Sequence, residues 1–123
     1  MRVKEALGAA AIEAVTGYLQ GCGFRVLDRN WRCQTGEVDI VARDGSALVF
    51  VEVKTRRSER AGTAEEAVSP TKQRRIAKLA NVYLKSCPDA AGDEVRFDVV
   101  AIRVIAPDRA LLRHYRAAFQ VTP

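Results

Sequence analysis

Two acidic residues and a lysine interrupt two apolar runs that lie close together in the sequence. Asp39 lies in the run Glu-Val-Asp-Ile-Val, and Glu52 and Lys54 lie in Phe-Val-Glu-Val-Lys, on either side of Asp44-Gly45. Charged side chains inside apolar strands are unfavourable unless a partner neutralises them. A divalent metal ion would neutralise both carboxylates, and the chemistry that such a site predicts is hydrolysis of a phosphodiester.

The spacing predicts a tight hairpin that carries these charges on one face. Asp44-Gly45 is a strong two-residue turn signal, and strand side chains alternate between faces. A turn centred there makes Asp39 and Glu52 diagonal neighbours, about 5–8 Å apart. A register shift of two residues would place them directly opposite each other, on the same face. The other face is predicted to be core and comprises Val38, Ile40, Ala42, Val49, Val51 and Val53.

The two carboxylates would repel each other at such short range. Two like charges about 4 Å apart, at an effective dielectric constant of about 20, cost roughly 4 kcal/mol. Lys54 could supply part of the compensating charge, whereas Mg²⁺ or Mn²⁺ would supply more. The alternative is an ion pair between Lys54 and either Glu52 or Asp39 that serves only the fold.

Length and composition predict one soluble domain over residues 1–123. The chain is 48% hydrophobic and 28% charged, which is ordinary for a globular protein with a single core. No apolar run approaches the ~20 residues of a membrane helix, so no membrane partner is expected. Cys22, Cys33 and Cys87 form no Cys-x-x-Cys motif, which argues against zinc and agrees with a cytoplasmic location.

The basic residues are concentrated just after the predicted hairpin. Residues 54–78 contain eight bases and three acids, a net +5 that equals the charge of the whole chain. A positive field beside carboxylates would hold a polyanion such as nucleic acid against them. The predicted nucleic-acid contacts are Arg56, Arg57, Arg60, Lys72, Arg75 and Lys78. For a charge run alone, a solvated loop and helix face is the simpler interpretation.

Hydrophobic periodicity predicts helices and strands in the order α-β-β-β-α-β, followed by a short strand. The predicted elements are a helix at 2–20, a strand at 24–32, the hairpin at 37–54, a helix at 70–86, and strands at 94–105 and 111–119. Ser69 can cap the second helix, and Pro70 suits its first position. This helix should bury Ile76, Leu79, Ala80 and Tyr83 and expose Lys72, Arg75 and Lys78. It can cross over to a parallel fourth strand, which gives a mixed sheet flanked by helices.

This order, with Asp39 twelve residues before Glu52-Val53-Lys54, resembles the PD-(D/E)XK nuclease superfamily, which includes restriction enzymes and Holliday junction resolvases. Over about residues 5–119 the chain is also similar to the YraN-type family of small bacterial proteins, which is described as uncharacterised and endonuclease-like. The motifs that carry this resemblance are Asn30-Trp31-Arg32, Gly36-Glu37-Val38-Asp39, Phe50-Val51-Glu52-Val53-Lys54-Thr55-Arg56, Lys72-Gln73-Arg74-Arg75 and Arg96-Phe97-Asp98-Val99-Val100. The resemblance implies an α/β fold with a restriction-endonuclease-like α-β-β-β-α-β core.

The resemblance also implies roles for the matching side chains. Asp39 and Glu52 would bind Mg²⁺ or Mn²⁺, with the Val53 carbonyl as a third protein ligand. Lys54 would orient or deprotonate the attacking water and steady the developing phosphorane charge. Gln73 would face the site from the second helix.

Four further residues have open or structural interpretations. The resolvase-like pattern places a glutamate on the first helix, where this chain has Ile12 with Glu13 beside it. Glu13 would reach the site only through a different helix register, since one residue turns a side chain about 100° around a helix. Otherwise the third acid is absent. Glu37 could substitute for it, or Glu37 could be only an exposed acid at the end of a strand. Asp98 is expected to tie the fourth strand to a neighbour, and His114 to be structural or on the surface.

The predicted function is metal-dependent cleavage of DNA, including branched or damaged DNA. Resolution of a junction would need two active sites and hence a homodimer. A nucleic-acid-binding module without turnover and a protein-interaction domain are the alternatives. The missing glutamate on the first helix favours the binding module, whereas the intact set of Asp39, Glu52 and Lys54 favours catalysis.

Overall fold

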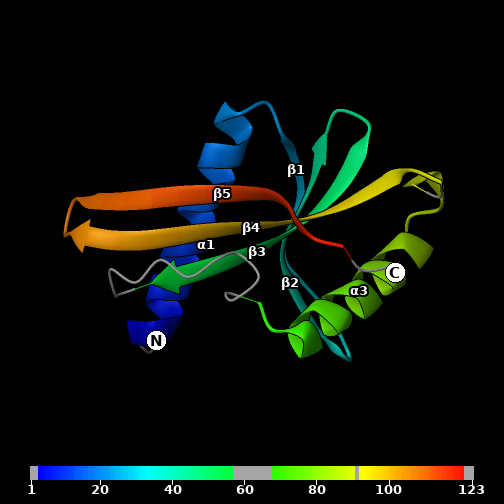
Figure 1. The fold of residues 1–123 in the computed structure, drawn as a ribbon, viewed down its shortest axis with the longest axis horizontal. Helices are drawn as coiled ribbons and strands as arrows, with labels where there is room; N and C mark the ends of the chain where they lie inside the picture. The colour runs from blue at the N-terminus through cyan, green and yellow to red at the C-terminus, as the bar shows by residue number, and fades with distance from the viewer. Residues whose placement is uncertain (1–2, 57–67, 91, 121–123) are drawn as a thin grey trace.

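Within residues 3–56, 68–90 and 92–120, which the computed structural model describes, the chain forms a five-stranded sheet between two helices (Figure 1). The elements are α1 (Val3–Gly21), β1 (Arg25–Cys33), β2 (Gly36–Asp44), β3 (Ala47–Arg56), α3 (Pro70–Lys85), the 3-10 turn η1 (Pro88–Ala90), β4 (Glu94–Ala106) and β5 (Arg109–Phe119). The predicted α-β-β-β-α-β order is confirmed.

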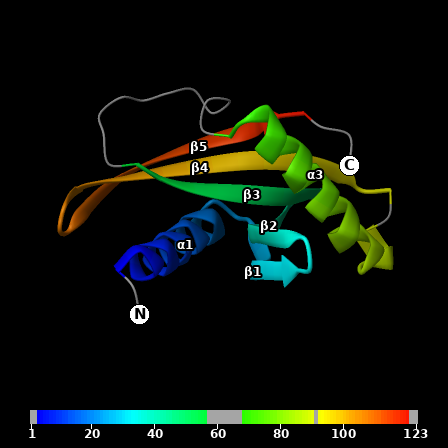
Figure 2. The same cartoon turned by 90° about the horizontal axis from the view of Figure 1, so that it is seen from below.

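The strands lie side by side in the order of the sequence, β1 to β5. Three neighbouring pairs are antiparallel, and β3 and β4 are parallel. The mixed sheet that the sequence predicted is therefore confirmed, with α3 in the connection between its two parallel strands. Figure 2 shows α1 on one side of the sheet and α3 on the other.

Each helix packs against one apolar face of the sheet. The α1 cluster comprises Val15, Leu19, Phe24, Ile40, Ala42, Ala47, Val49, Val51 and Val100. The α3 cluster includes Val41, Leu48, Phe50, Phe97 and Val99 together with Ile76, Leu79, Ala80 and Tyr83 of the helix, whose burial is as predicted. Both faces of the sheet are thus core.

Val38 departs from the predicted alternation, because it packs in the α3 cluster whereas Ile40 packs in the α1 cluster. In the neighbouring strand, Asn30 lies between the residues that pair with Val38 and Ile40 and has a φ of 51°. The backbone of β1 therefore leaves the extended conformation at Asn30, across the ladder from the stretch of β2 between Val38 and Ile40. Val38 is buried, as predicted, but the prediction that it shares a face of the sheet with Ile40 was wrong.

The start of α3 is the one that the sequence predicted. Ser69 is the N-cap, and its Oγ accepts a hydrogen bond of 3.2 Å from the backbone N of Lys72. Pro70 occupies the first turn, where its missing N–H leaves no helical bond unmade. Within the described residues, neither helix is long and apolar enough to cross a membrane.

The β2–β3 hairpin has the register shifted by two residues from the turn centred on Asp44-Gly45. Asp44 pairs with Ala47, so the two turn residues are Gly45 and Ser46. Gly45 has a φ of 59°, and glycine in the first position is another favoured form of two-residue turn. The last pair of this ladder is Ile40 with Val51, and one step further brings Asp39 level with Glu52.

Asp98 is a fully buried carboxylate that joins β4 to β5 and α1. Arg96 donates to both of its oxygens at 2.9 and 3.0 Å, and the backbone N of Ala117 donates at 3.0 Å. His114 Nε2 lies 2.8 Å from Asp98, and its Nδ1 lies 3.0 Å from the Tyr18 hydroxyl on α1. Burial alone would raise the pKa of Asp98, but hydrogen bonds from His114 and Arg96 outweigh it and hold the pKa below its ordinary value. These contacts agree with the structural interpretations of Asp98 and His114.

Replacement of Asp98 should therefore destabilise the fold. In Asp98→Asn the amide cannot serve as acceptor for all of these donors, and the charge of Arg96 loses its buried partner. We expect the free energy of unfolding to fall by about 2–4 kcal/mol, measured by urea denaturation. Asp108→Asn, in the exposed turn between β4 and β5, should change it by less than about 0.5 kcal/mol. Equal losses in the two variants would contradict this assignment.

Candidate active site

Asp39 and Glu52 come together where β2 and β3 reach the end of the α3 cluster. Asp39 Oδ2 accepts a hydrogen bond of 2.8 Å from the backbone N of Val53, the residue after Glu52. Asp39 is partly buried, and Glu52 is buried with 9% of its surface exposed. The shifted register places the two carboxyl groups opposite each other, which is the second of the two arrangements considered from the sequence.

The acidic surroundings of Asp39 make its charge unfavourable. Burial raises the pKa of Asp39 to about 7, the Glu52 carboxylate contributes to the rise, and the N–H of Val53 opposes it. Among the described residues, Asp39 takes part in no ion pair. Near pH 7 this carboxyl is therefore close to half protonated, and a cation beside it would favour the ionised form.

Lys72 neutralises Glu52, which is a contact that the sequence did not predict. Lys72 Nζ lies 2.5 Å from Glu52 Oε1, and the two side chains are 30% and 11% exposed. Burial works to lower the pKa of Lys72, but the hydrogen bond to Glu52 outweighs it and raises the pKa. The prediction that Lys72 is an exposed residue of the helix was wrong. The ion pair considered from the sequence, between Lys54 and an acid, is made here by Lys72.

A signal for this contact is present in the sequence. Lys72 lies four residues before Ile76, and Leu79 and Tyr83 follow at steps of three and four. Residues at these steps share one face of a helix, and Ile76, Leu79 and Tyr83 are the buried, sheet-facing stripe of α3. Lys72 therefore continues that stripe into the first turn, where the apolar core gives way to Glu52.

Lys54 is the second lysine of the site. It lies two residues beyond Glu52 on β3 and is partly buried. Burial lowers the pKa of Lys54, and the nearby Lys72 ammonium lowers it further. Asp39, Glu52, Lys54 and Lys72 are called the acid–lysine cluster below. A lysine with a lowered pKa gives up its proton more readily than an exposed one, and this suits it to acid–base work.

The remaining predicted site residues make other contacts. Val53 contacts Asp39 through its backbone N–H, and its carbonyl stays a predicted ligand of the metal. Gln73 Nε2 donates a hydrogen bond of 2.9 Å to the backbone oxygen of Val68, which ties the first turn of α3 to the segment before it. Glu37 is 3.4 Å from Arg32, so its carboxylate faces an exposed guanidinium, although its charge still helps to raise the pKa of Asp39.

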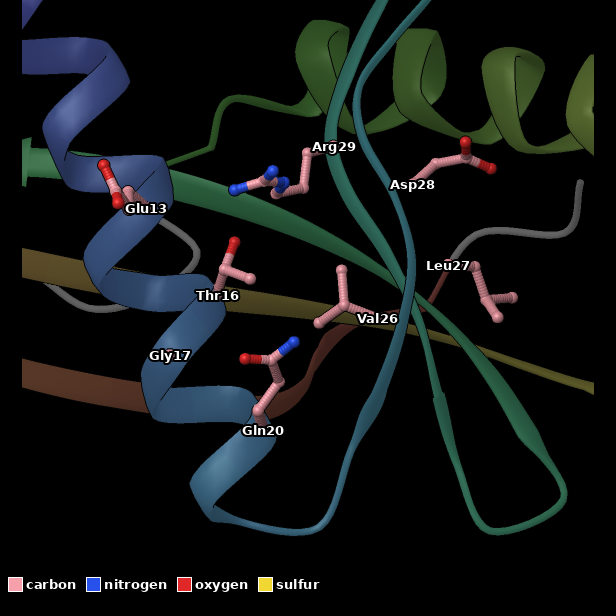
Figure 3. A pocket seen from close by; sticks show the side chains of 8 residues that line it. All are labelled: Glu13, Thr16, Gly17, Gln20, Val26, Leu27, Asp28 and Arg29. Carbon is pink, nitrogen blue, oxygen red and sulfur yellow. The ribbon is translucent and has the colours of Figure 1, made fainter.

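On the first helix, Glu13 lies beside β1 and not among the residues of the acid–lysine cluster. Ile12 packs against the α1 cluster, and Glu13 is exposed. Glu13 and Arg29 face an open hollow of about 530 Å³ between α1 and β1 (Figure 3). Over residues 3–56, 68–90 and 92–120, no three side chains of His, Cys, Asp or Glu gather as a metal-binding group. Asp39 and Glu52 are therefore the two acids on which a metal site would depend.

The predicted nucleic-acid contacts are only partly described. Arg75 and Lys78 are exposed on α3, as predicted. Arg56 is the last residue of β3, and its side chain lies outside the described part of the structure, as do Arg57 and Arg60. The exposed Arg75 and Lys78 therefore belong to the same helix as Lys72, which pairs with Glu52.

The chain is similar to a group of bacterial proteins over nearly its whole length. The model of a family described as "Uncharacterised protein family UPF0102" matches residues 13–102. The chain is 46% identical over 117 residues to a UPF0102 protein of Geobacter sulfurreducens. This alignment covers 94% of this chain and 89% of the relative. It is 50% identical over 98 residues to a UPF0102 protein of Mycolicibacterium vanbaalenii, and this alignment covers 80% of each chain. It is 46% identical over 114 residues to a UPF0102 protein of Kineococcus radiotolerans, and this alignment covers 93% of each chain. The matched stretch contains the whole acid–lysine cluster.

The raised pKa of Asp39 predicts a stability that falls with pH. The ordinary pKa is 3.8 and the folded value is about 7, so between these values the unfolded chain has lost a proton that the folded chain keeps. The free energy of unfolding should therefore decrease from pH 4 to pH 7, by up to about 4 kcal/mol from this group. Asp39→Asn removes the titration, so its stability relative to the natural chain should rise over the same window. Urea denaturation in EDTA at pH 5 and pH 8 measures this, and parallel pH profiles would contradict it.

Proposed function

We propose that this chain, which belongs to the UPF0102 family, is a metal-dependent nuclease that hydrolyses phosphodiester bonds in DNA. The observation that carries the proposal is the acid–lysine cluster, with two carboxyl groups level on neighbouring strands and two lysines beside them. An ion pair that served only the fold would need only Lys72 and Glu52, and it would leave the presence of Asp39 and Lys54 beside it unexplained. The unfavourable charge of Asp39, with a pKa of about 7, suits a site that binds a cation.

The acids of the cluster fit a hard divalent cation. Mg²⁺ is commonly held by one or two carboxylates together with water and substrate phosphate oxygens, and Mn²⁺ accepts similar ligands. Asp39 and Glu52 would supply the two carboxylates. A bound ion would lower the pKa of water and offset the charge that develops on the phosphoryl group.

The basic residues of the site complete the chemistry. Lys54, with its lowered pKa, would accept a proton from the attacking water and then place its ammonium beside the negative charge of the reacting phosphate. Arg75 and Lys78 would hold neighbouring phosphates of the nucleic-acid backbone from the exposed side of α3. The order of elements and the spacing of Asp39, Glu52 and Lys54 resemble PD-(D/E)XK nucleases and further support this mechanism. Cleavage of both strands at a junction would require a homodimer.

The proposal predicts that purified protein nicks supercoiled DNA when Mg²⁺ or Mn²⁺ is added. Asp39→Asn and Glu52→Gln should each lower the nicking rate by at least about 100-fold, since even the outer partners of metal ligands are typically worth 10–100-fold. The rate is measured from the conversion of supercoiled to open-circular plasmid.

Matched variants separate the site from general charge effects. Asp108→Asn and Glu94→Gln remove the same charges at exposed positions on β4 and its following turn, and should leave the rate unchanged. Nicking that persists in both site variants would trace to a contaminating nuclease. That result, or no nicking of plasmid and branched DNA with either metal, would overturn the proposal.

A nucleic-acid-binding module without turnover is the second candidate function. It is favoured by α1, because a partly buried Ile12 packs against the α1 cluster where an acid is expected, and Glu13 faces the hollow beside β1. A site with two acids would then hold substrate without cleaving it. Binding that is lost with rising salt, together with no cleavage, would favour this module.

Both candidates predict contacts between α3 and phosphates. The double variant Arg75→Gln/Lys78→Gln should bind a labelled DNA duplex more weakly and reduce the slope of log affinity against log salt by about 2, because each lost phosphate contact removes about one unit. Fluorescence anisotropy from 50 to 300 mM KCl measures the slope. An unchanged slope would mean that this face of α3 does not contact the nucleic acid.

A further inference from the structure

Lys72 occupies an electrostatically unfavourable place in α3. Ser69 is the N-cap, so Lys72 lies in the first turn, where the positive end of the helix dipole disfavours a cation by about 0.3–1 kcal/mol. The first turn of α3 contains no acidic residue that would offset this. The compensating charge comes instead from Glu52 on β3, 2.5 Å from the ammonium.

Glu52 is also one of the two carboxylates that the proposed metal would need. Its side chain is 11% exposed, so it has little room for a second cation beside the Lys72 ammonium. Lys54 adds another positive charge close by, and its lowered pKa reflects in part the nearness of Lys72. A divalent ion on Glu52 would therefore repel two lysines, and at least one of them must move or be matched by an anion.

Lys72 has access to solvent. Its side chain is 30% exposed, and it reaches Glu52 on a flexible four-carbon stem from the end of a helix. Arg75, one turn further along α3, is exposed, so an ammonium that leaves Glu52 enters a surface that is already positive. A phosphate of bound nucleic acid would stabilise it there.

We infer that Lys72 is an exchangeable cation: it neutralises Glu52 in the metal-free protein, and a divalent ion that binds Asp39 and Glu52 transfers its ammonium to a phosphate of the nucleic acid. The inference rests on the proposed function and deepens it, since it couples metal binding to substrate binding through one side chain. Lys72 is thus a substrate-contacting residue in the metal-loaded protein alone.

The first part of the inference, that a metal ion displaces Lys72 from Glu52, is tested by measuring metal affinity without any substrate. Titration calorimetry with Mn²⁺ at fixed ionic strength should show Lys72→Met binding about 10-fold more tightly than the natural chain, because the metal no longer displaces an ammonium. Lys85→Met removes the same charge from the exposed end of α3 and should leave the affinity unchanged. Lys72→Gln provides a second variant in case the methionine variant does not fold, as judged by circular dichroism.

The salt dependence of DNA binding tests the second half. With Ca²⁺ in place of a catalytic ion, Lys72→Met should reduce the slope of log affinity against log salt by about 1 relative to the natural chain. In EDTA the two slopes should agree, because Lys72 is then held by Glu52. Equal slopes in Ca²⁺, or a difference already present in EDTA, would overturn the inference.

The failure of this inference differs from the failure of the proposed function. If the Lys72 variants and the natural chain bind Mn²⁺ equally while nicking still depends on Asp39 and Glu52, Lys72 does not exchange and the nuclease proposal stands. If neither the natural chain nor Lys72→Met binds Mn²⁺, both fail together.

Discussion

The whole structure depends on β3, a central strand that is buried on both faces. Val49 and Val51 pack under α1, and Leu48 and Phe50 pack under α3. A strand covered on both sides has no face for charge until it passes the end of the core. Glu52 is the first charged residue along β3, and it lies at that point. The same packing that makes the sheet rigid therefore fixes the backbone that carries the acid–lysine cluster.

Two aspartates of this sheet, Asp98 and Asp39, differ in their surroundings, and this difference distinguishes a structural carboxylate from a candidate functional one. Asp98 accepts hydrogen bonds from Arg96 and His114, and they hold its pKa low against the effect of burial. Asp39 accepts a hydrogen bond from the backbone N–H of Val53 and faces the Glu52 carboxyl group, and its pKa rises to about 7. The fold thus supplies donors to one buried carboxyl and an acidic neighbour to the other. A buried carboxyl whose charge the fold does not stabilise is where an added cation gains most.

The elements could be predicted from the sequence because their signals are local, such as the Ser69 cap that starts α3. The register of the hairpin could not, because Gly45 fits either of two tight turns. The choice depends on packing between strands, where Val41 pairs with Phe50 in the α3 cluster. The burial of Lys72 depends on where α3 docks on the sheet, which a charge count along the chain does not reveal. The nearness of Asp39 to Glu52 could be predicted, because a tight hairpin brings residues equally far from its turn together, and the hydrogen bond from Val53 N to Asp39 agrees with it.

Charge balance in the acid–lysine cluster makes metal and substrate binding interdependent on the proposed function. The two acids and two lysines nearly neutralise one another when ionised, so a divalent ion leaves a positive excess that a phosphodiester would offset. Each ligand then binds better in the presence of the other, and this coupling is reciprocal. Ile12, which packs against the α1 cluster, stands where a third acid is expected, so a substrate phosphate would take the place of that ligand. A two-acid site of this kind would hold its metal best when nucleic acid is already in place, and this would restrict hydrolysis to bound substrate.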